Sequence, residues 1–570
     1  MRTNILAAAV VTIVAALAVP TSAVAAPQGA EPTTWHVRAG ASGGGDGSER
    51  SPFASLAAVQ KASGPDDTIV VDPARSPLDG GILLKQGQRL IGGGAPVVGA
   101  DPNSPRPRLT NTALLGSTGD AVTLAPGTEV RNLVIEGTNR SAIYGNDATG
   151  VTIAGNDISG SNRLCHDGFI IGPFQIPASI ALREAIPKLP NFVVLNNGWA
   201  AVMLDYHRAA GAVTVEDNSV HDTACGDGID VRTFGTATVT ADLTGNDLSN
   251  INVGLAKLSV LAMGLQSNDT SSLTATLRGN TQRDIADPAR SPLNKLADSE
   301  GVFINPLGDS HISVDVHDNT FARGDGNFSA NGLEYVTTTG SPTSDVTVTN
   351  STFTDVTGDV IESYNLSPDA ARHSLTLDHV TGAHSEFPGA VLNPVVPANL
   401  GTCLVATGFG RGATTDLIVR NTTLRGCSAD GLGVISYVPE GPEPSTARMS
   451  FDVRNSVIDG TAAHGINIIN VGALTALQGR LENTTVINTT QAPIATANHG
   501  TIGEATLDFG GGPLGSAGGN CFTPGLRGPA DLSPIPVTAR HNWWGTAALP
   551  PAVTVPNAAP ALPTSPRPDC

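Results

Sequence analysis

The chain is poor in the residues that favour helices. Only five lysines occur in 570 residues, and aromatic residues make up 4%. Gly, Thr, Val, Asn and Asp recur throughout instead, and these residues favour strands and turns. An apolar content of 40% is enough to form a core, which excludes disorder as the default. The composition therefore predicts an all-β protein with little helix.

Long apolar runs are absent after residue 25. Residues 1–25 contain one early Arg, a continuous apolar run, Pro20 and the residues "AVA" at Ala23–Ala25. This pattern is typical of a secretory signal peptide with an A-x-A cleavage site. No later run approaches the roughly 20 residues that a membrane helix needs. We therefore expect a secreted, extracellular protein without a membrane span.

Positive charge is also scarce. The formal net charge is −19, and removal of the signal peptide with its one Arg makes it −20. Nucleic-acid binding requires clustered Lys and Arg, so nucleic acid is excluded as a partner. The same charge disfavours polyanionic glycans such as pectate unless a basic groove or a bound cation offsets it. Neutral glycans meet no such barrier.

Several catalytic and metal-binding motifs are missing. The sequence has no H-E-x-x-H pair and no phosphate-binding loop. Its cysteines form an even set of six with no C-x-x-C pair, which favours disulfides over metal ligation in an oxidising compartment. These cysteines are Cys165, Cys225, Cys403, Cys427, Cys521 and Cys570.

What the sequence does contain is a repeat. A short alternating strand that ends near an Asn, such as "VTVEDNS" from Val213, is followed after a polar gap by a second apolar strand, such as "DGIDV" from Asp227. Most marker asparagines are about thirty residues apart, which predicts a solenoid with one coil per repeat. The markers are Asn218, Asn246, Asn280, Asn319, Asn350, Asn421, Asn455 and Asn483.

The marker asparagines have two interpretations. Stacked Asn side chains at a tight corner can hydrogen-bond from coil to coil, and Asn tolerates the left-handed backbone that such corners need. Sequons such as "NTT" at Asn421, Asn483 and Asn488 would then follow from the repeat instead of marking glycosylation. We favour the first interpretation, a ladder of asparagines that hydrogen-bond from coil to coil.

Three features together resemble a right-handed parallel β-helix protein of the pectate-lyase-like superfamily. They are the segment from "WHVRAG" to "TIVV", the coil pattern, and "LDFGGGPLGSAGGNCF" followed by "HNWWG". The resemblance implies a β-helix with an N-terminal helical cap and a proline-rich C-terminal tail. The expected divisions are a signal peptide over 1–25, an N-terminal segment with the capping helix over 35–67, the β-helix over 68–545 and an extended tail over 546–570.

Local signals define the two ends of this solenoid. Ser51 as N-cap with Pro52 at the first helical position predicts the capping helix, and Thr68–Val71 is the first expected coil strand. Trp543 and Trp544 offer rings for sugar stacking, but beside a coil end we favour capping of the core.

Coil stacking suggests disulfide partners. Cys403 and Cys427 lie 24 residues apart, close to one coil, so they fall in register on neighbouring turns. Cys521 with Cys570 would hold the tail. Cys165 with Cys225 then remains, across a long insertion at Gly172–Phe192.

Aligning the second strands on their glycine predicts one outward column. Its members are Asp230, Phe303, Glu334, Glu362, Gly433 and Asn467. Glu334 and Glu362 are expected on adjacent coils, and paired carboxyls suit glycoside hydrolysis. We therefore name Glu334, Glu362 and Asp230 as candidate catalytic residues, with Tyr335 and Tyr364 as candidate substrate contacts.

The column also has an interpretation without any catalytic role. Alternation makes every second strand residue point outward, and an acidic protein has Asp or Glu at many outward positions. The acids and amides just before the glycines, at Asp167, Asp227, Glu300, Asn331 and Asp430, are better explained by corner geometry.

A second candidate cluster lies in "WAAVMLDYHR" and "HDTACGDGIDVR". Trp199, Tyr206 and Arg232 are candidate substrate-binding residues there. Asp227 and Asp230 are candidate ligands for Ca²⁺, which a lyase would use to stabilise charge, although two carboxylates are a weak signal.

No catalytic residue can be transferred from known relatives, because the motifs of polygalacturonases, pectin methylesterases and pectate lyases are missing. Two functions therefore remain open. The first is a secreted carbohydrate-active enzyme, a glycoside hydrolase or polysaccharide lyase, acting on an extracellular polysaccharide. The second is a non-catalytic surface or matrix β-helix that binds glycans or other partners. Few aromatics weaken the first, and the insertions at 172–192 and 283–300 weaken the second.

Overall fold

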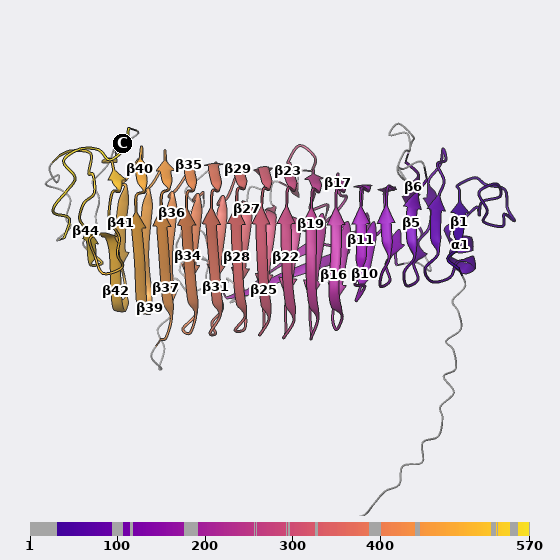
Figure 1. The fold of residues 1–570 in the computed structure, drawn as a ribbon, viewed down its shortest axis with the longest axis horizontal. Helices are drawn as coiled ribbons and strands as arrows, with labels where there is room; N and C mark the ends of the chain where they lie inside the picture. Colours follow the sequence, from indigo (N-terminus) through magenta and orange to yellow (C-terminus); the bar gives the residue numbers. More distant parts are fainter. Residues whose placement is uncertain are drawn as a thin grey trace, which may run out of the picture.

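The computed structural model is a long solenoid of parallel strands (Figure 1). It describes residues 31–93, 106–114, 118–175, 192–255, 257, 259–291, 293–294, 297–324, 329–386, 401–438, 445–525, 532, 534–547, 557–568 and 570. The expected signal peptide lies outside these residues. No helix in this described part is long and apolar enough to cross a membrane.

Each coil passes through three parallel sheets, which we number in the order that the chain follows them around a coil. The chain runs from sheet 1 to sheet 2 and then, through a tight corner, to sheet 3. The architecture is a right-handed parallel β-helix, as the sequence predicts, and right-handed crossovers are the rule for parallel strands. The sequence repeat identified two strands per coil. The third, in sheet 3, is short and directly follows the corner.

The strands of sheet 1 carry the candidate site. They are β4 (Ile82–Leu83), β7 (Val122–Thr123), β10 (Ile143–Asn146), β15 (Val202–Tyr206), β18 (Ile229–Thr233), β21 (Ser259–Ser267), β24 (Asp298–Pro306), β27 (Ser329–Thr337), β30 (Ile361–Asn365), β33 (Leu404–Gly408), β36 (Leu432–Val438), the first part of β39 (Ile466–Glu482) and β41 (Ile494–Asn498).

Sheet 2 is joined to sheet 1 through the continuous strand β39. Its strands are β1 (Thr34–Val37), β2 (Thr68–Val71), β5 (Arg89–Gly92), β8 (Glu129–Arg131), β11 (Val151–Ala154), β16 (Ala210–Glu216), β19 (Thr238–Thr244), β22 (Ser272–Arg278), β25 (His311–His317), β28 (Thr343–Thr349), β31 (Arg372–Asp378), β34 (Thr414–Arg420), β37 (Arg448–Arg454), the last part of β39, β42 (Thr501–Gly510) and β44 (Val537–Ala539).

Within the described residues, sheet 3 has fourteen strands. They are β3 (Leu78–Asp79), β6 (Arg108–Thr110), β9 (Val134–Glu136), β12 (Asp157–Ser159), β17 (Ser219–His221), β20 (Asp247–Ser249), β23 (Thr281–Ile285), β26 (Thr320–Gly324), β29 (Thr352–Val356), β32 (Thr381–Ser385), β35 (Thr423–Cys427), β38 (Val457–Asp459), β40 (Thr485–Ile487) and β43 (Cys521–Phe522).

The core fills the inside of the coils. Along each strand alternate side chains point inward, and the inward ones are mainly Val, Leu, Ile and Ala with almost no exposure. In β19, for example, Val239, Ala241 and Leu243 are buried between exposed or half-buried neighbours. Outward positions of sheets 2 and 3 are mostly exposed or half-buried, whereas those in the middle of sheet 1 are buried as well.

A ladder of asparagines fixes the corner between sheets 2 and 3. Asn156, Asn218, Asn246, Asn280 and Asn319 are buried at equivalent positions of five successive coils. The side-chain amide and the backbone N–H of each donate to the side-chain oxygen of the next, at 2.9–3.1 Å. After Asn319 the ladder passes to Ser351, whose hydroxyl accepts from the backbone of Asn319.

The other marker asparagines occupy a different position. Asn350, Asn421, Asn455 and Asn483 lie one residue before the ladder position and have positive φ angles of 48–52°. Asp217, Gly245 and Gly279 fill the same place in other coils. The repeat therefore uses Asn twice, once for its amide and once for its tolerance of the left-handed backbone.

The N-terminal end differs in detail from the expectation. The helix α1 (Leu56–Ala62) begins after Ser55, whose hydroxyl accepts from the backbone of Ala58, so Ser51 is not the N-cap. Ser51 instead forms a bridge with Ser48. The strand Thr68–Val71 forms as predicted, but β1 precedes it in sheet 2. Leu56 and Val59 pack into the core.

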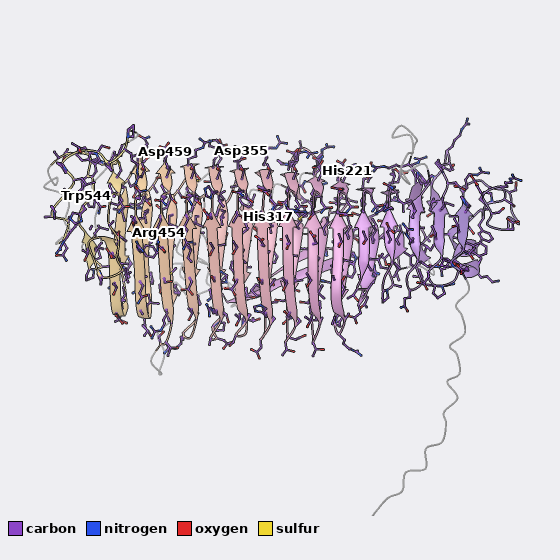
Figure 2. The ribbon with its side chains drawn as sticks, in the orientation of Figure 1. His221, His317, Asp355, Arg454, Asp459 and Trp544 are labelled. Atoms are coloured by element: carbon purple, nitrogen blue, oxygen red, sulfur yellow. A yellow bond between two sulfur atoms is a disulfide. The ribbon has the colours of Figure 1, made fainter. Side chains whose placement is uncertain are left out.

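The C-terminal end is closed by aromatic packing. Trp544, which is 2% exposed, lies at this end of the solenoid (Figure 2). Its ring centroid is 4.8 Å from that of Phe522. This burial agrees with a capping role for Trp544, whereas Trp543 is half-buried. The proline-rich tail is described only at 557–568 and 570.

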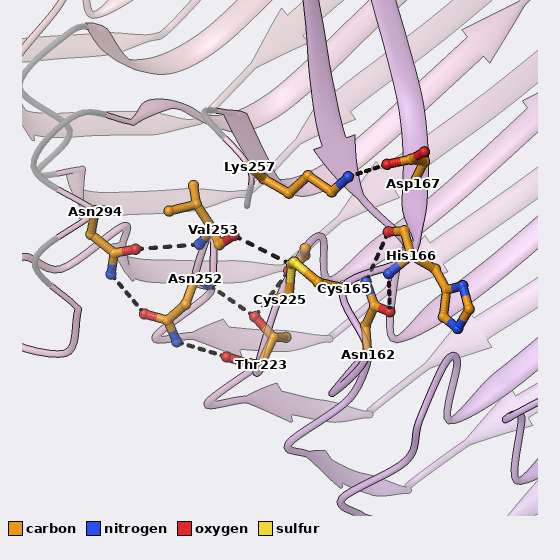
Figure 3. The surroundings of a disulfide bond; sticks show 11 residues. Asn162, Cys165, His166, Asp167, Thr223, Cys225, Asn252, Val253, Lys257 and Asn294 are labelled. Atoms are coloured by element: carbon orange, nitrogen blue, oxygen red, sulfur yellow. Dashed lines mark hydrogen bonds and ion pairs between the residues drawn. A yellow bond between two sulfur atoms is a disulfide. The ribbon is translucent and has the colours of Figure 1, made fainter. Parts of the chain in front are cut away.

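The three disulfides are those that coil stacking suggested. They join Cys165 to Cys225, Cys403 to Cys427 and Cys521 to Cys570. The first lies beside a second polar ladder, in which Asn294 donates to Asn252 and Asn252 donates to the Thr223 carbonyl (Figure 3). The insertion between Cys165 and Cys225 begins and ends as an antiparallel hairpin of β13 (Asp167–Gln175) and β14 (Phe192–Gly198). Most of Gly172–Phe192 lies outside the described residues.

We predict that the ladder contributes strongly to stability. Asn280→Leu removes an acceptor that holds Asn246 and a donor to the Leu243 carbonyl, leaving buried polar groups without partners. Each such group costs about 1–3 kcal/mol. The urea midpoint should fall clearly for Asn280→Leu and much less for Asn350→Gly, which keeps the left-handed backbone. Equal losses in both variants would contradict the ladder.

Candidate active site

The outward side chains of sheet 1 form a continuous column. The register places the six predicted members in it. The other places are filled by Leu83, Thr123, Tyr144, Met203, Gly264, Val405 and Ala495. Glu334 pairs directly with Glu362 on the next coil. Strands in such a sheet are about 4.8 Å apart, so the two side chains are neighbours.

Asn331 holds the two glutamates together. Its Nδ2 donates to Oε2 of Glu362 at 2.9 Å and to Oε2 of Glu334 at 3.3 Å. Sharing one amide nitrogen limits the separation of these oxygens to about 6 Å, close to the range of retaining glycosidases. Tyr364 hydrogen-bonds Glu362 from the same strand. Sequence reasoning assigned Asn331 to the corner and missed its contact with the pair.

Two further acids lie next to the pair. Asp298 and Glu300 come from β24, one coil before Glu334, and one carboxylate oxygen from each of the three lies within 4.8 Å of the others. Glu300 is fully buried, and neither of its oxygens receives a hydrogen bond from an N–H or hydroxyl group of the described residues. The only sequence signal for this cluster was the acid at both ends of "DSE".

The corner interpretation holds for most of the acids and amides before the glycines. Asp227 accepts from the backbone of Leu261 at 2.8 Å, and Asp430 accepts from that of His464 at 2.8 Å. Asn331 accepts from the backbone of Asp359. It is wrong for Glu300, which contacts other carboxyls, and for Asp167, which forms an ion pair with Lys257 at the start of the hairpin.

Burial raises the pKa of every carboxyl in this region. It raises the pKa of Asp298 to about 7 and that of Glu334 to about 8, with the charge of Asp298 adding to the effect on Glu334. The pKa values of Glu300 and Glu362 are also raised well above their usual range, first by burial and then by neighbouring acids. No Lys, Arg or His in the described part of the chain forms an ion pair with these four acids.

Asp230 and Asp227 form a separate pair three coils away. Gly264 and Phe303 stand between Asp230 and Glu334 in the outward column, so Asp230 is not part of the Glu334 site. The Asp227 and Asp230 carboxyls contact each other, and burial raises both pKa values, that of Asp227 to about 8.

This pair fits a cation poorly. Asp227 already accepts hydrogen bonds from Leu261 and Asn197, and the Arg232 guanidinium lies close enough to stabilise the charged form of both acids. A positive side chain beside two carboxyls disfavours a second positive charge. The prediction of Ca²⁺ at Asp227 and Asp230 gains no support from the geometry.

Trp199 and Arg232 belong to an aromatic–arginine cluster. Arg232 donates to Asp205 at 2.7 Å, and its guanidinium lies 5.5 Å from the Trp199 ring. The guanidinium of Arg140 lies 4.6 Å from the same ring and is paired with Asp120.

Tyr144 completes this cluster at a ring-centroid distance of 5.6 Å from Trp199. Both rings are half-buried and both guanidiniums are paired with carboxylates. The surface is therefore aromatic and close to neutral. Sequence reasoning missed Tyr144 and Arg140, because the short strand β10 carries no acid and lacks the repeat's glycine start.

Two predicted substrate contacts are wrong. Tyr206 and Tyr335 are fully buried inside the coils. The Tyr206 hydroxyl donates to the Ala148 carbonyl, and the Tyr335 ring stacks on His373 at 3.6 Å. Neither can touch a glycan on the outer face. Tyr364 points outward beside Glu362 and is 3% exposed.

His221 lies on another face. It belongs to β17 in sheet 3 and binds Asp157 at 2.9 Å, which raises its pKa to about 9 (Figure 2). His207 stacks on Phe234 with a ring distance of 5.1 Å. Local contacts therefore explain the positions of both histidines.

The fold, with its outward-facing column of residues on sheet 1, defines the structural class of the protein, the right-handed parallel β-helix. This architecture is consistent with the pectate-lyase-like superfamily that the sequence resembles. No protein-family model matches the chain, and no curated protein matches it.

Several solved structures are similar to this chain. The periplasmic alginate epimerase AlgG is 10% identical, with 77% of each chain covered and a TM-score of 0.33. The GH87 alpha-1,3-glucanase from Streptomyces thermodiastaticus is 13% identical, with 76% of this chain and 65% of that chain covered and a TM-score of 0.33. The GH136 lacto-N-biosidase from Eubacterium ramulus is 11% identical, with 90% and 67% covered and a TM-score of 0.32.

We predict that stability falls as pH rises from about 5 to 8. The folded state keeps a proton on the buried carboxyl of Asp298 up to about pH 7 and on that of Glu334 up to about pH 8, whereas the unfolded chain has already lost these protons. The free energy of unfolding should therefore fall by up to about 1.4 kcal/mol per pH unit for each such group.

Urea unfolding in EDTA at several pH values checks this prediction. Asp298→Asn should flatten the pH dependence, because it removes one of the carboxyls that titrate. A flat profile for the unaltered protein would contradict the buried acid cluster.

Proposed function

We propose that the protein is a secreted carbohydrate-active enzyme, a glycoside hydrolase that cleaves a neutral glycan along the outer face of sheet 1. Glu334 and Glu362 are its catalytic carboxyls. The observation that supports this function best is the in-register pair of glutamates that share the Asn331 amide.

The electrostatics of the pair suit acid–base chemistry. Two adjacent buried carboxyls cannot both ionise at low cost, so one keeps its proton while the other carries the charge. A glycosidase needs one protonated carboxyl to donate to the leaving oxygen and one ionised carboxyl as nucleophile or base. Asn331 holds both oxygens in a fixed relation, and Tyr364 contacts Glu362.

The aromatic–arginine cluster supports a neutral substrate. Trp199 and Tyr144 present half-buried rings on the same face as the glutamates, and such rings pack against the apolar faces of sugars. The Arg140 and Arg232 charges are offset by Asp120 and Asp205, so little net positive charge remains for a polyuronate. The chain as a whole is acidic, with a net charge of −19.

A non-catalytic glycan-binding β-helix is the rival function. It is favoured by the small exposure of the pair, 7% for Glu334 and 6% for Glu362. Such burial suits a structural polar cluster as well as a closed active site. The two functions differ in what substitution of a single carboxyl should do.

We predict that Glu334→Gln and Glu362→Gln each abolish hydrolysis. Screening the secreted protein against neutral and uronate glycans would identify a substrate, and kcat should then fall by at least about a hundredfold in each variant. Glu504→Gln, at an exposed position of sheet 2, is the matched control and should keep full activity. A fully active Glu334→Gln enzyme would rule out this assignment.

Trp199 should affect binding more than chemistry. Trp199→Ala is expected to raise KM severalfold with a smaller change in kcat, because a stacking ring binds substrate and transition state alike. Trp199→Phe should restore most of the affinity. If Trp199→Ala bound and cleaved the glycan normally, the substrate would not reach this cluster.

A further inference from the structure

We propose that Asp298, Glu300 and Glu334 form a Ca²⁺ site on the outer face of sheet 1. The three carboxyls come from adjacent coils, with Asp298 and Glu300 two residues apart on β24 and Glu334 on β27. The site shares Glu334 with the proposed catalytic pair but is argued from ligand geometry alone.

The spacing of the carboxylates fits a cation of this size. One oxygen from each residue lies within 4.8 Å of the other two. Two ligands on opposite sides of a Ca²⁺ ion, each about 2.4 Å away, are about 4.8 Å apart. Three carboxylates can supply between about three and six of the six to eight oxygens that Ca²⁺ takes, and water or substrate oxygens can supply the rest.

Glu300 provides independent support. Its side chain is fully buried, and no N–H group or hydroxyl of the described residues donates to either of its oxygens, whose polar neighbours are the carboxyls of Asp298 and Glu334. At the same corner of other coils, Asp227 and Asp359 do accept from backbone N–H groups of the following coil. Glu300 is one methylene longer than these aspartates and turns its carboxylate toward Asp298 and Glu334 instead.

The three carboxyls are surrounded by other acids, and no cationic side chain of the described residues balances their charge. The acids whose charges act on this cluster are Asp227, Asp298, Glu334 and Asp359, and no cationic side chain of the described residues pairs with Asp298, Glu300 or Glu334. A buried carboxylate without a partner is costly unless a proton or a metal ion neutralises it. In the proposed enzyme, a ligated Glu334 would be the ionised member of its pair with Glu362.

Calcium binding to the full secreted chain tests the site without any substrate. After EDTA treatment and dialysis, millimolar Ca²⁺ should raise the melting temperature clearly at pH 8 and much less at pH 5, where protons compete for the same oxygens. Calorimetric titration with Ca²⁺ measures the affinity directly. Absence of both binding and a thermal shift at pH 8 would overturn the proposal.

Variants locate the ion. Glu300→Gln should weaken Ca²⁺ binding by at least about tenfold. Without Ca²⁺ at pH 8 it should melt no lower than the unaltered protein, because it removes a buried acid. Asp298→Asn gives a second test if Glu300→Gln fails to fold. Asp227→Asn, a buried acid at the same corner two coils earlier, is the matched control and should keep the Ca²⁺ response.

The outcomes separate this site from the proposed catalysis. Glu362→Gln should lose hydrolysis and keep the Ca²⁺ shift, since Glu362 is not a ligand. A Ca²⁺ shift that persists unchanged in both Glu300→Gln and Asp298→Asn would place the ion elsewhere and overturn the proposal, whatever the activity of the protein.

Discussion

The register between coils is the constraint on which the rest of the structure depends. A slip of one residue would turn every inward side chain outward, because strand side chains alternate. The amide ladder from Asn156 to Asn319 opposes such a slip, since each side chain is bonded to its equivalent one coil away. The same register brings Glu334 opposite Glu362 and holds Glu300 beside Glu334.

The acids of the candidate site repel one another, and the asparagine ladder helps the fold to tolerate this repulsion. Several acids from neighbouring coils are stacked where water has little access, and their charges repel one another. A freely moving loop would separate them, whereas strands bonded on both sides cannot. Stability gained in the core and the ladder therefore maintains an arrangement of carboxyls that is unfavourable by itself, as is common at functional sites.

Much of the fold could be predicted from the sequence, because the repeat fixes one residue type at one position of each coil. The outward column containing Glu334 and Glu362 followed from aligning the glycines, and the pairing of Cys403 with Cys427 followed from coil length. Tyr335 and Tyr206 were misplaced because nearness along the chain was taken as nearness in space. Alternation itself puts Tyr335 inside when Glu334 points outward. Asp298 and Arg140 could not be predicted, because Asp298 is the first residue of its strand and Arg140 precedes its strand, and these segments vary in length from coil to coil.

The disulfide between Cys165 and Cys225 has a consequence for proteolysis. It spans 60 residues that include the β13–β14 hairpin and the following coil. Any single cut in the backbone between these two cysteines leaves the halves of the molecule covalently joined under oxidising conditions. A protease acting there would therefore produce a nicked chain that separates into two bands only after reduction.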